Sequence, residues 1–247
     1  MRSIRLFSDL PLEPGRELSL PDGAAAHAVR VLRLRAGDAV TLFNGDGHEY
    51  LATLVAAGAR EVRAAIETVA SPARESPLRL TLLQAVARGE KMDWIVQKAT
   101  ELGVARIVPV ATERSEVKLD ASRGEKRLEH WRAVAIAACE QCGRNTLPRI
   151  DAPVSLAAWL GANATPPSAT RWVLQPEEGA LRARDLQVKA PATLELAVGP
   201  EGGFGETDLA ALREHDFRGL ALGPRILRTE TAGVAAIAAL QALYGDG

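Results

Sequence analysis

A strand that runs into a glycine-rich loop and then into a helix decides the fold of this chain. Residues 196–206 read Leu196-Ala197-Val198-Gly199-Pro200-Glu201-Gly202-Gly203-Phe204-Gly205-Glu206. Glycines in such a loop let the backbone approach a ligand where a Cβ would otherwise intervene. No Gly-Lys-Ser/Thr follows, and the third glycine of a dinucleotide fingerprint is missing, so neither of these phosphate-binding motifs is present. The remaining interpretations are a ligand loop of another kind and a plain tight turn.

A second loop repeats this arrangement after the next predicted strand, residues 219–222. It reads Leu222-Gly223-Pro224-Arg225-Ile226-Leu227-Arg228-Thr229-Glu230-Thr231-Ala232-Gly233. Ligands of open α/β sheets bind outside the carboxyl ends of the strands, so two such loops predict one shared pocket. The side chains of Arg225, Arg228 and Glu230 either face this pocket or form a solvated rim. A glutamate at a helix start also interacts favourably with the helix dipole.

Strands and longer helices alternate along the chain beyond residue 77. Apolar patterns predict strands over 78–86, 104–110, 171–175, 194–198 and 219–222, and helices over 90–102, 122–142, 206–215 and 229–244. This alternation is typical of an α/β domain, with a mostly parallel sheet that helices cover on both faces.

The first 70 residues follow a different pattern of short strands separated by turns. Strands are predicted over 4–7, 39–43, 49–55 and 61–66, and a short helix over 24–34. This pattern indicates a small β-barrel. Two prolines with small and charged residues over 71–77 indicate a linker, so we expect one domain over 1–72 and a second over 73–247.

The predicted last helix, 229–244, carries no charge between Thr231 and Tyr244. An apolar helix of this kind must be buried on more than one side, either in the core or against a second copy in a twofold homodimer. Its uncharged part rises about 20 Å, which is short of the roughly 30 Å hydrocarbon core of a membrane. We therefore expect no membrane span.

Composition indicates a folded protein without a strong overall charge. Apolar residues make up 47% and charged residues 25%, and 30 Lys and Arg face 31 Asp and Glu for a formal charge of −1. Any contact with nucleic acid must therefore come from local clusters. Two cysteines cannot staple a chain of 247 residues, and the amino terminus lacks the apolar run of a signal peptide, so we expect a cytoplasmic protein.

Motifs for metals and nucleophiles are weak. Cys139-Glu140-Gln141-Cys142 lies at the end of a predicted helix, and no other cysteine or suitably spaced histidine completes a zinc site. The four histidines are scattered, and no serine or cysteine lies in a nucleophile elbow. We therefore expect neither a bound metal nor triad hydrolysis.

The two loops resemble those of a known enzyme family. The stretches Val198-Gly199-Pro200-Glu201-Gly202-Gly203 and Leu222-Gly223-x-x-Ile226-Leu227-Arg228-x-Glu230-Thr231-Ala232 are similar to the bacterial 16S rRNA uridine N3-methyltransferases. This is the ribosomal RNA small subunit methyltransferase E family of the SPOUT class. Four further stretches agree: Lys91-x-x-x-x-Val96-x-Lys98-x-Thr100-Glu101-Leu102-Gly103, Glu113-Arg114-Ser115, Glu140-Gln141-Cys142-Gly143-Arg144 and His27-x-x-x-Val31-Leu32-Arg33. The resemblance spans the whole chain.

The resemblance implies a PUA-like β-barrel that binds RNA, followed by a SPOUT α/β domain whose last segments form a deep trefoil knot. It also implies S-adenosylmethionine as the methyl donor, 16S rRNA in the small ribosomal subunit as the substrate, and a homodimer that needs no metal. The cofactor residues that it carries over are Gly199, Pro200, Glu201, Gly202, Gly203, Leu222, Gly223, Ile226, Leu227 and Ala232.

The chemistry of the implied reaction leads to hypotheses about the roles of charged residues. Loss of the uracil N3 proton leaves negative charge on the carbonyl oxygens, so we expect Arg228 to stabilise that charge. Glu230 or Glu201 would orient Arg228 or help to remove the proton. The expected RNA contacts are Arg2, Arg5, Arg30 and Arg33 on the barrel, and Arg88, Lys91 and Arg114 near the pocket. The alternatives are a SPOUT enzyme that acts on transfer RNA or a ribose 2′-hydroxyl, and a non-catalytic RNA-binding factor of ribosome assembly.

Overall fold

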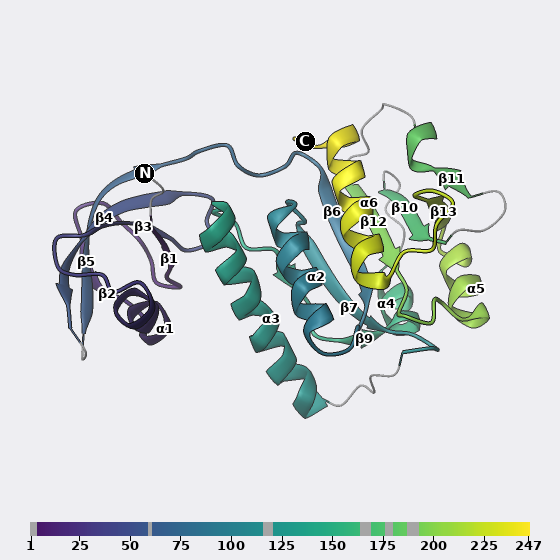
Figure 1. The fold of residues 1–247 in the computed structure, drawn as a ribbon, viewed down its shortest axis with the longest axis horizontal. Helices are drawn as coiled ribbons and strands as arrows, with labels where there is room; N and C mark the ends of the chain where they lie inside the picture. Colours follow the sequence, from purple (N-terminus) through teal and green to yellow (C-terminus); the bar gives the residue numbers. More distant parts are fainter. Residues whose placement is uncertain (1–3, 59–60, 116–120, 164–168, 176–179, 187–192) are drawn as a thin grey trace. The chain divides into compact units, whose positions relative to one another are not determined.

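The computed structural model describes residues 4–58, 61–115, 121–163, 169–175, 180–186 and 193–247, without the side chains of 121–123. The chain divides into two compact units. The first joins Met1–Glu75 to Ile136–Leu147, and the second joins Ser76–Ala135 to Pro148–Gly247. Figure 1 shows the elements of each unit along the chain. The sequence patterns do not predict that residues 136–147 return to the first unit.

The first unit is built on a five-stranded mixed sheet in the order β1-β3-β4-β5-β2. Its strands are β1 (Arg5–Phe7), β2 (Glu17–Ser19), β3 (Ala39–Phe43), β4 (Glu49–Ala57) and β5 (Val62–Ala70). β1 and β3 are parallel, and the other neighbours are antiparallel. Alternate residues of β4, namely Tyr50, Ala52 and Leu54, enter the core of this unit. The predicted small β-domain is confirmed, and β2 is a strand that the sequence pattern missed.

The predicted helix over 24–34 is a short α-helix, α1 (Asp22–Ala26), followed by a π-helical turn, η1 (His27–Val31). Just beyond this turn, Arg33 has a left-handed backbone with φ +57°. Such a conformation is uncommon for residues that carry a side chain. Arg30, Val31 and Arg33 are all exposed, so this turn presents both charge and apolar surface to the solvent.

Buried polar contacts explain why residues 136–147 belong to the first unit. The Arg5 guanidinium donates to Glu49 Oε2 at 3.0 Å, to the Arg144 carbonyl at 3.0 Å and to Asn145 Oδ1. It also lies over the Phe43 ring, 4.8 Å from the ring centroid. An arginine in apolar surroundings needs such acceptors for its five N–H groups. Two of these three acceptors belong to Arg144 and Asn145, within the segment 136–147.

The second unit contains an eight-stranded sheet. Its path runs β11-β13-β10-β12-β6-β7-β8 with β9 against β7, and every described pair is parallel. The strands are β6 (Arg79–Ala85), β7 (Arg106–Ala111), β8 (Arg149–Ile150), β9 (Val154–Ser155), β10 (Ala169–Leu174), β11 (Leu181–Arg182), β12 (Thr193–Val198) and β13 (Arg218–Ala221). The helices are α2 (Glu90–Glu101), α3 (Ala121–Cys142), α4 (Leu156–Ala162), α5 (Glu206–Glu214) and α6 (Thr229–Tyr244), with a 3-10 turn, η2 (Ala183–Asp185). The predicted α/β class is confirmed.

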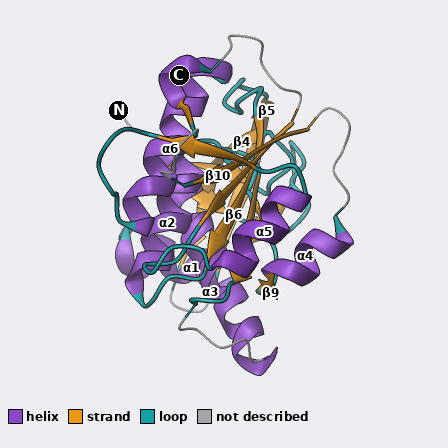
Figure 2. Cartoon of the chain, turned by 90° about the vertical axis from the view of Figure 1, so that its right-hand side faces the viewer, coloured by secondary structure: helices purple, strands orange, loops and turns teal. Residues whose placement is uncertain are grey.

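Alternate side chains of the central strands face two helical layers. Leu80 and Leu82 of β6 pack in a core with residues of α2, α3 and α6, whereas Leu83 and Ala85 pack with residues of α4 and α5. Figure 2 shows the sheet between these layers, with α2 and α6 on one face and α4 and α5 on the other. Strands buried on both faces are mainly apolar, and the polar residues Gln84 and Arg171 in these strands are themselves buried and hydrogen-bonded.

The last helix, α6, has the predicted bounds, but it is covered mainly on one side within the chain. It buries Gly233, Ala236, Ile237 and Leu240, and it leaves Ala238, Ala242 and Leu243 exposed. The expectation of burial on several sides is therefore not met by a single chain. The predicted homodimer, which would cover this surface, stays a prediction. Among the described residues, no helix combines the length and hydropathy that a membrane crossing requires.

Candidate functional site

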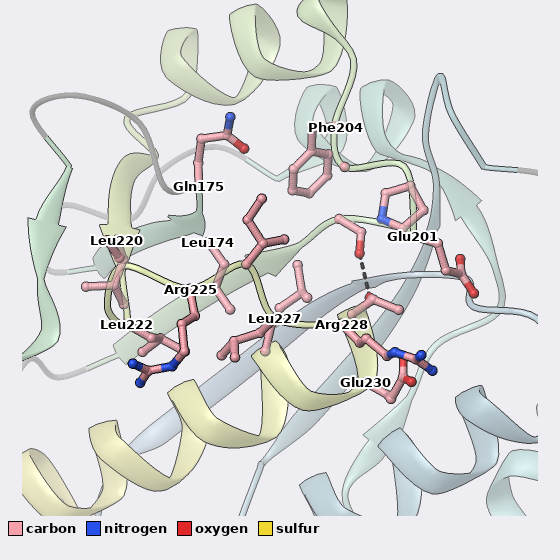
Figure 3. A pocket seen from close by; sticks show the side chains of 18 of the residues that line it. Leu174, Gln175, Glu201, Phe204, Leu220, Leu222, Arg225, Leu227, Arg228 and Glu230 are labelled. Carbon is pink, nitrogen blue, oxygen red and sulfur yellow. Dashed lines mark hydrogen bonds between the residues drawn. The ribbon is translucent and has the colours of Figure 1, made fainter.

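A cavity of about 410 Å³ lies in the second unit, at the carboxyl ends of β10, β12 and β13 (Figure 3). The loop after β12, the loop after β13 and the first turn of α6 supply most of its wall. Leu174 and Gln175 at the end of β10 and Lys91 of α2 complete the lining. The prediction that the two glycine-containing loops share one pocket is confirmed. Its position is the one at which open α/β sheets bind ligands.

The loop after β12 requires glycine at two positions. A Cβ on Gly199 would lie 3.1 Å from the backbone nitrogen of Phe204, and Gly203 has φ +70°. The Gly203 N–H donates to the Pro200 carbonyl at 2.9 Å and closes a tight turn. The loop is therefore a tight turn and a bare cavity wall at once, because glycine provides both.

The outer side of this loop is fastened to the loop after β7. Arg114 Nη1 donates to the Gly202 carbonyl at 3.0 Å. Asp208 Oδ2 accepts the backbone N–H groups of Glu113 at 3.0 Å and Gly205 at 3.2 Å. Neither Gly202 nor Arg114 lines the cavity. Their contact with each other holds the loop in place from behind.

The loop after β13 gives the cavity an apolar wall. Leu222, Ile226 and Leu227 line it together with Leu220 from the strand itself. Ile226 lies at the rim, where 91% of its surface is exposed. A ligand that enters between these side chains would remove apolar surface from water on both partners.

The first turn of α6 brings two opposite charges to the cavity. Figure 3 shows Arg228, Glu230 and Glu201 toward one end of the cavity and Arg225 toward the other. Arg228 is exposed, whereas Glu230 Oε2 is buried and has no hydrogen-bond partner among the described residues. Buried carboxylate oxygens normally accept a hydrogen bond, so an unpaired oxygen here is an open position for a donor.

Glu201 is already paired. Lys91 Nζ donates to Glu201 Oε1 at 2.9 Å. Partial burial acts to raise the pKa of Glu201, but the Lys91 hydrogen bond and the backbone N–H groups of Glu201 and Arg88 outweigh it, so this pKa is lowered. A carboxylate with a lowered pKa and an ammonium partner is a weak proton acceptor. Of the two glutamates predicted for this task, Glu230 therefore has the more suitable surroundings.

Most of the predicted site residues line one cavity. Lining residues that the sequence predicted are Gly199, Pro200, Glu201, Gly203, Leu222, Gly223, Ile226, Leu227, Ala232, Arg228, Glu230 and Lys91. Lining residues outside that prediction are Leu174, Gln175, Val198, Phe204, Leu220, Ala221, Arg225 and Thr229. Gln175 directly follows β10. Because ligands bind at the carboxyl ends of parallel strands, the same argument that predicted the two loops could also have predicted Gln175.

The predicted RNA contacts separate into several groups. Arg2 lies outside the described residues. Arg30, Arg33 and Arg88 are exposed. Arg5 corrects the prediction, because its side chain is only 7% exposed and its donors serve Glu49 and the 136–147 segment. This guanidinium holds the first unit together and is not available to RNA.

Cys139 and Cys142 are free thiols, and Cys139 is buried. A hydrogen bond with Cys142 and burial both raise the pKa of the Cys139 thiol, which disfavours a reactive thiolate. Within the described part of the chain, no three His, Cys, Asp or Glu side chains gather in the way that a metal site needs.

Comparisons with known proteins agree with this geometry. Residues 74–241 match the model of an RNA methyltransferase domain, and residues 20–67 match that of an RNA methyltransferase PUA domain. The ribosomal RNA small subunit methyltransferase E of Bacillus subtilis is 31% identical over 243 residues, which cover 95% of each chain.

Two solved structures were determined with S-adenosylmethionine. A Legionella pneumophila protein with bound cofactor superimposes with a TM-score of 0.94 at 39% identity, over 100% of both chains. The ribosomal RNA small subunit methyltransferase E of Neisseria gonorrhoeae, bound to S-adenosylmethionine, superimposes with a TM-score of 0.90 at 37% identity, over 99% of both chains.

Proposed function

The chain belongs to the ribosomal RNA small subunit methyltransferase E family, and from this premise we propose that it transfers a methyl group from S-adenosylmethionine to N3 of a uridine in 16S rRNA. The observation that carries the proposal is the convergence of both loops and the first turn of α6 on one cavity. The substrate of the protein would be the small ribosomal subunit, or a precursor of it, in the cytoplasm.

The residues of the cavity fit S-adenosylmethionine. The cavity volume of about 410 Å³ is within the range of small-molecule sites. A Cβ on Gly199 would press on Phe204 and Gly203, so the loop beside the cavity is packed closely against itself and keeps a fixed shape. Leu222 and Leu227 offer apolar surface to an adenine ring, and the unpaired Glu230 Oε2 offers an acceptor to an ammonium or an N–H group.

The bound cofactor would supply an activated methyl group, so the protein chiefly has to align the acceptor and stabilise charge. Arg228 is exposed at the end of the cavity that also holds Glu230, where its guanidinium would stabilise negative charge on a uracil carbonyl oxygen. Glu230 would accept the N3 proton or orient Arg228, because its Oε2 has no other partner in the described structure. Glu201, held by Lys91, would shape the wall.

RNA contacts would come from exposed arginines of both units. We assign Arg30 and Arg33 to phosphates beside η1, and Arg88 to phosphates near the cavity. An Arg30→Ala variant should weaken RNA binding and reduce its salt dependence, because each phosphate contact releases counterions, while the affinity for S-adenosylmethionine stays the same. Loss of cofactor affinity instead would refute this division of labour.

The trefoil knot and the homodimer belong to the same proposal. The support for the dimer is the exposed apolar side of α6, with Ala238, Ala242 and Leu243. Light scattering at working concentration should give a mass near twice 26.3 kDa. An active, stable monomer would refute the proposed homodimer.

The decisive experiment is nucleoside mass spectrometry. Unmethylated small subunits are incubated with the purified protein and isotope-labelled S-adenosylmethionine, and the RNA is digested to nucleosides. Labelled 3-methyluridine is the expected product. Label in another base or in a ribose would keep the fold and overturn the assigned target. Cofactor binding without label on ribosomal or transfer RNA would favour the non-catalytic assembly factor.

A further inference from the structure

A chain of hydrogen bonds links three distant segments behind the cavity. Gln84 Nε2 donates to Thr229 Oγ1 at 3.0 Å, and Thr229 Oγ1 donates to the Gly199 carbonyl at 2.6 Å. Gln84 lies in β6, Thr229 begins α6, and Gly199 begins the loop after β12. These hydrogen bonds therefore connect β6, an inner strand of the sheet, to both of the segments that hold the proposed cofactor and catalytic residues.

The direction of this chain is fixed by the atoms at its ends. Gln84 Nε2 also donates to the Ala85 carbonyl at 3.0 Å, so the amide nitrogen has to occupy this side of the side chain. The Thr229 hydroxyl must then accept from Gln84, and its single proton is left for Gly199, whose carbonyl can only accept. Each N–H and O–H of the network therefore has one acceptor, while Gln84 Oε1 is left buried without a partner among the described residues.

Burial makes these contacts strong constraints. Gln84 is 0% exposed and Thr229 is 5% exposed, so water does not compete for their polar groups. Gln84 faces the same side of β6 as Leu80 and Leu82, toward α6, and it pairs in register with Val198 directly before Gly199. A buried polar group that loses its partner pays its full desolvation cost, which keeps such a network intact.

The network sits directly beside the proposed catalytic residues. Thr229 is flanked by Arg228 and Glu230, so its hydroxyl fixes the backbone from which both of these side chains extend. Its other partner, Gly199, is the position where an added Cβ would press on Phe204. A shift of this contact would move the cavity wall and the charged pair relative to each other.

We propose that Gln84 and Thr229 are positioning residues that hold the loop after β12 and the first turn of α6 in the geometry required for cofactor binding and methyl transfer. The proposal rests on the proposed function. It assigns no contact with the substrate to Gln84, which acts through Thr229.

The test compares Thr229→Val, which removes the hydroxyl at nearly constant shape, with Thr229→Ser, which keeps it. Calorimetric titration with S-adenosylmethionine and single-turnover methylation of small subunits provide the two readouts. Thr229→Val should bind the cofactor about tenfold more weakly or transfer methyl about tenfold more slowly, the size expected for one buried hydrogen bond. Thr229→Ser should lie within about threefold of wild type.

Gln84→Met removes the donor at the other end of the network and should change both readouts in the same direction as Thr229→Val. The matched control is Gln241→Met, because Gln241 is also buried, in the same helix as Thr229. Its amide donates to the Leu102 carbonyl at 2.7 Å, and it does not line the cavity. This control should lower the melting temperature and leave cofactor affinity within about twofold of wild type.

Two results would overturn the inference. One is a folded Thr229→Val protein with wild-type affinity and turnover. The other is an equal loss of affinity in Gln241→Met, which would mean that only general stability matters. Failure of the proposed function looks different, because the wild-type protein itself would then not bind S-adenosylmethionine or would not label the RNA.

Discussion

The surroundings of Arg5 and the cavity at the end of β12 contrast in how their polar groups are used. Around Arg5, Glu49, Arg144 and Asn145 all accept hydrogen bonds from one guanidinium, which is left 7% exposed. At the cavity, Arg228 is exposed and Glu230 Oε2 is buried without a partner in the described structure. Both clusters keep polar atoms without a partner in the described structure, Arg5 Nε and Asn145 Nδ2 in the first and Glu230 Oε2 in the second. The difference lies in their positions. The hydrogen bonds of Arg5 join segments of one core and stabilise the fold, whereas Arg228 and Glu230 line a cavity that a ligand can enter.

The largest effect should come from Arg228→Ala. If this guanidinium stabilises charge that develops on the uracil, methyl transfer should fall by about 100-fold or more, with unchanged melting temperature and cofactor affinity. Single-turnover labelling of small subunits measures the loss. Arg225→Ala removes the same charge from the other end of the cavity and should cost less than about tenfold. Normal turnover in a folded Arg228→Ala protein would show that this arginine belongs to the solvated rim.

Gly199→Ala should weaken cofactor binding by about tenfold or more, because the new Cβ would press on a backbone nitrogen that no side-chain rotation can move. The contact would be only 3.1 Å from Phe204 N. Gly202→Ala is the matched variant, since its Cβ would meet only the Arg114 side chain, at 3.7 Å. Calorimetric titration should separate the two. Equal affinities would mean that the loop opens freely and that Gly199 is not a close wall.

Arg5→Ala should affect stability without affecting chemistry. It would leave Asn145 Oδ1 and the Arg144 carbonyl buried without their donor, at a cost of about 2–3 kcal/mol in the free energy of unfolding. Arg16→Ala is the control, because Arg16 pairs with Glu13 in the solvent and should cost less than about 0.5 kcal/mol. Denaturant titration measures both. A weaker salt dependence of RNA binding in Arg5→Ala, with unchanged stability, would restore Arg5 as a phosphate contact.

The smallest effect concerns the pH dependence of Glu201. Its pKa in the folded protein is lowered from 4.5. The ion pair with Lys91 therefore stabilises the fold above pH 4.5, and this stabilisation is lost as the pH falls through the lower pKa of the folded state. Lys91→Ala should raise the pKa of Glu201 toward its ordinary value, as measured by carboxyl NMR titration. Lys98→Ala, which breaks a similar pair with Glu101, should leave it unchanged. An acid limb of methyl transfer above pH 5 that moves with Lys91→Ala would make Glu201 the proton acceptor.

Local patterns were sufficient where neighbours in sequence determine the structure. The strand β3 and the helix α6 have the predicted bounds, because an apolar run between turn residues and a long charge-free stretch are each unambiguous. The helix α4 was missed although Ser155 caps it by accepting the Ala158 N–H, since a helix of seven residues is too short to show a period.

Contacts across long sequence separations could not be predicted. Arg5 looks like a phosphate-binding arginine in the sequence, because its acceptors at Arg144 and Asn145 lie 139 and 140 residues away. Thr229 lies in a quoted motif, yet its role depends on Gln84, which lies 145 residues earlier in a strand whose local pattern does not single it out. Spacing rules describe single elements, whereas these roles arise from how elements meet.

Residues 136–147 also affect the order in which the protein can fold during synthesis. The segment 136–147 supplies hydrogen-bond partners for the Arg5 guanidinium and for the Phe7 N–H, which donates to Glu140. After it has made residues 1–75, the ribosome must add about 60 more residues before it reaches this segment. At roughly 5–20 residues per second, the nascent amino-terminal sheet waits some seconds for this segment. Its maturation therefore depends on the emergence of the first strands and helices of the second unit, so the two halves of the protein are coupled in time before either has bound a ligand.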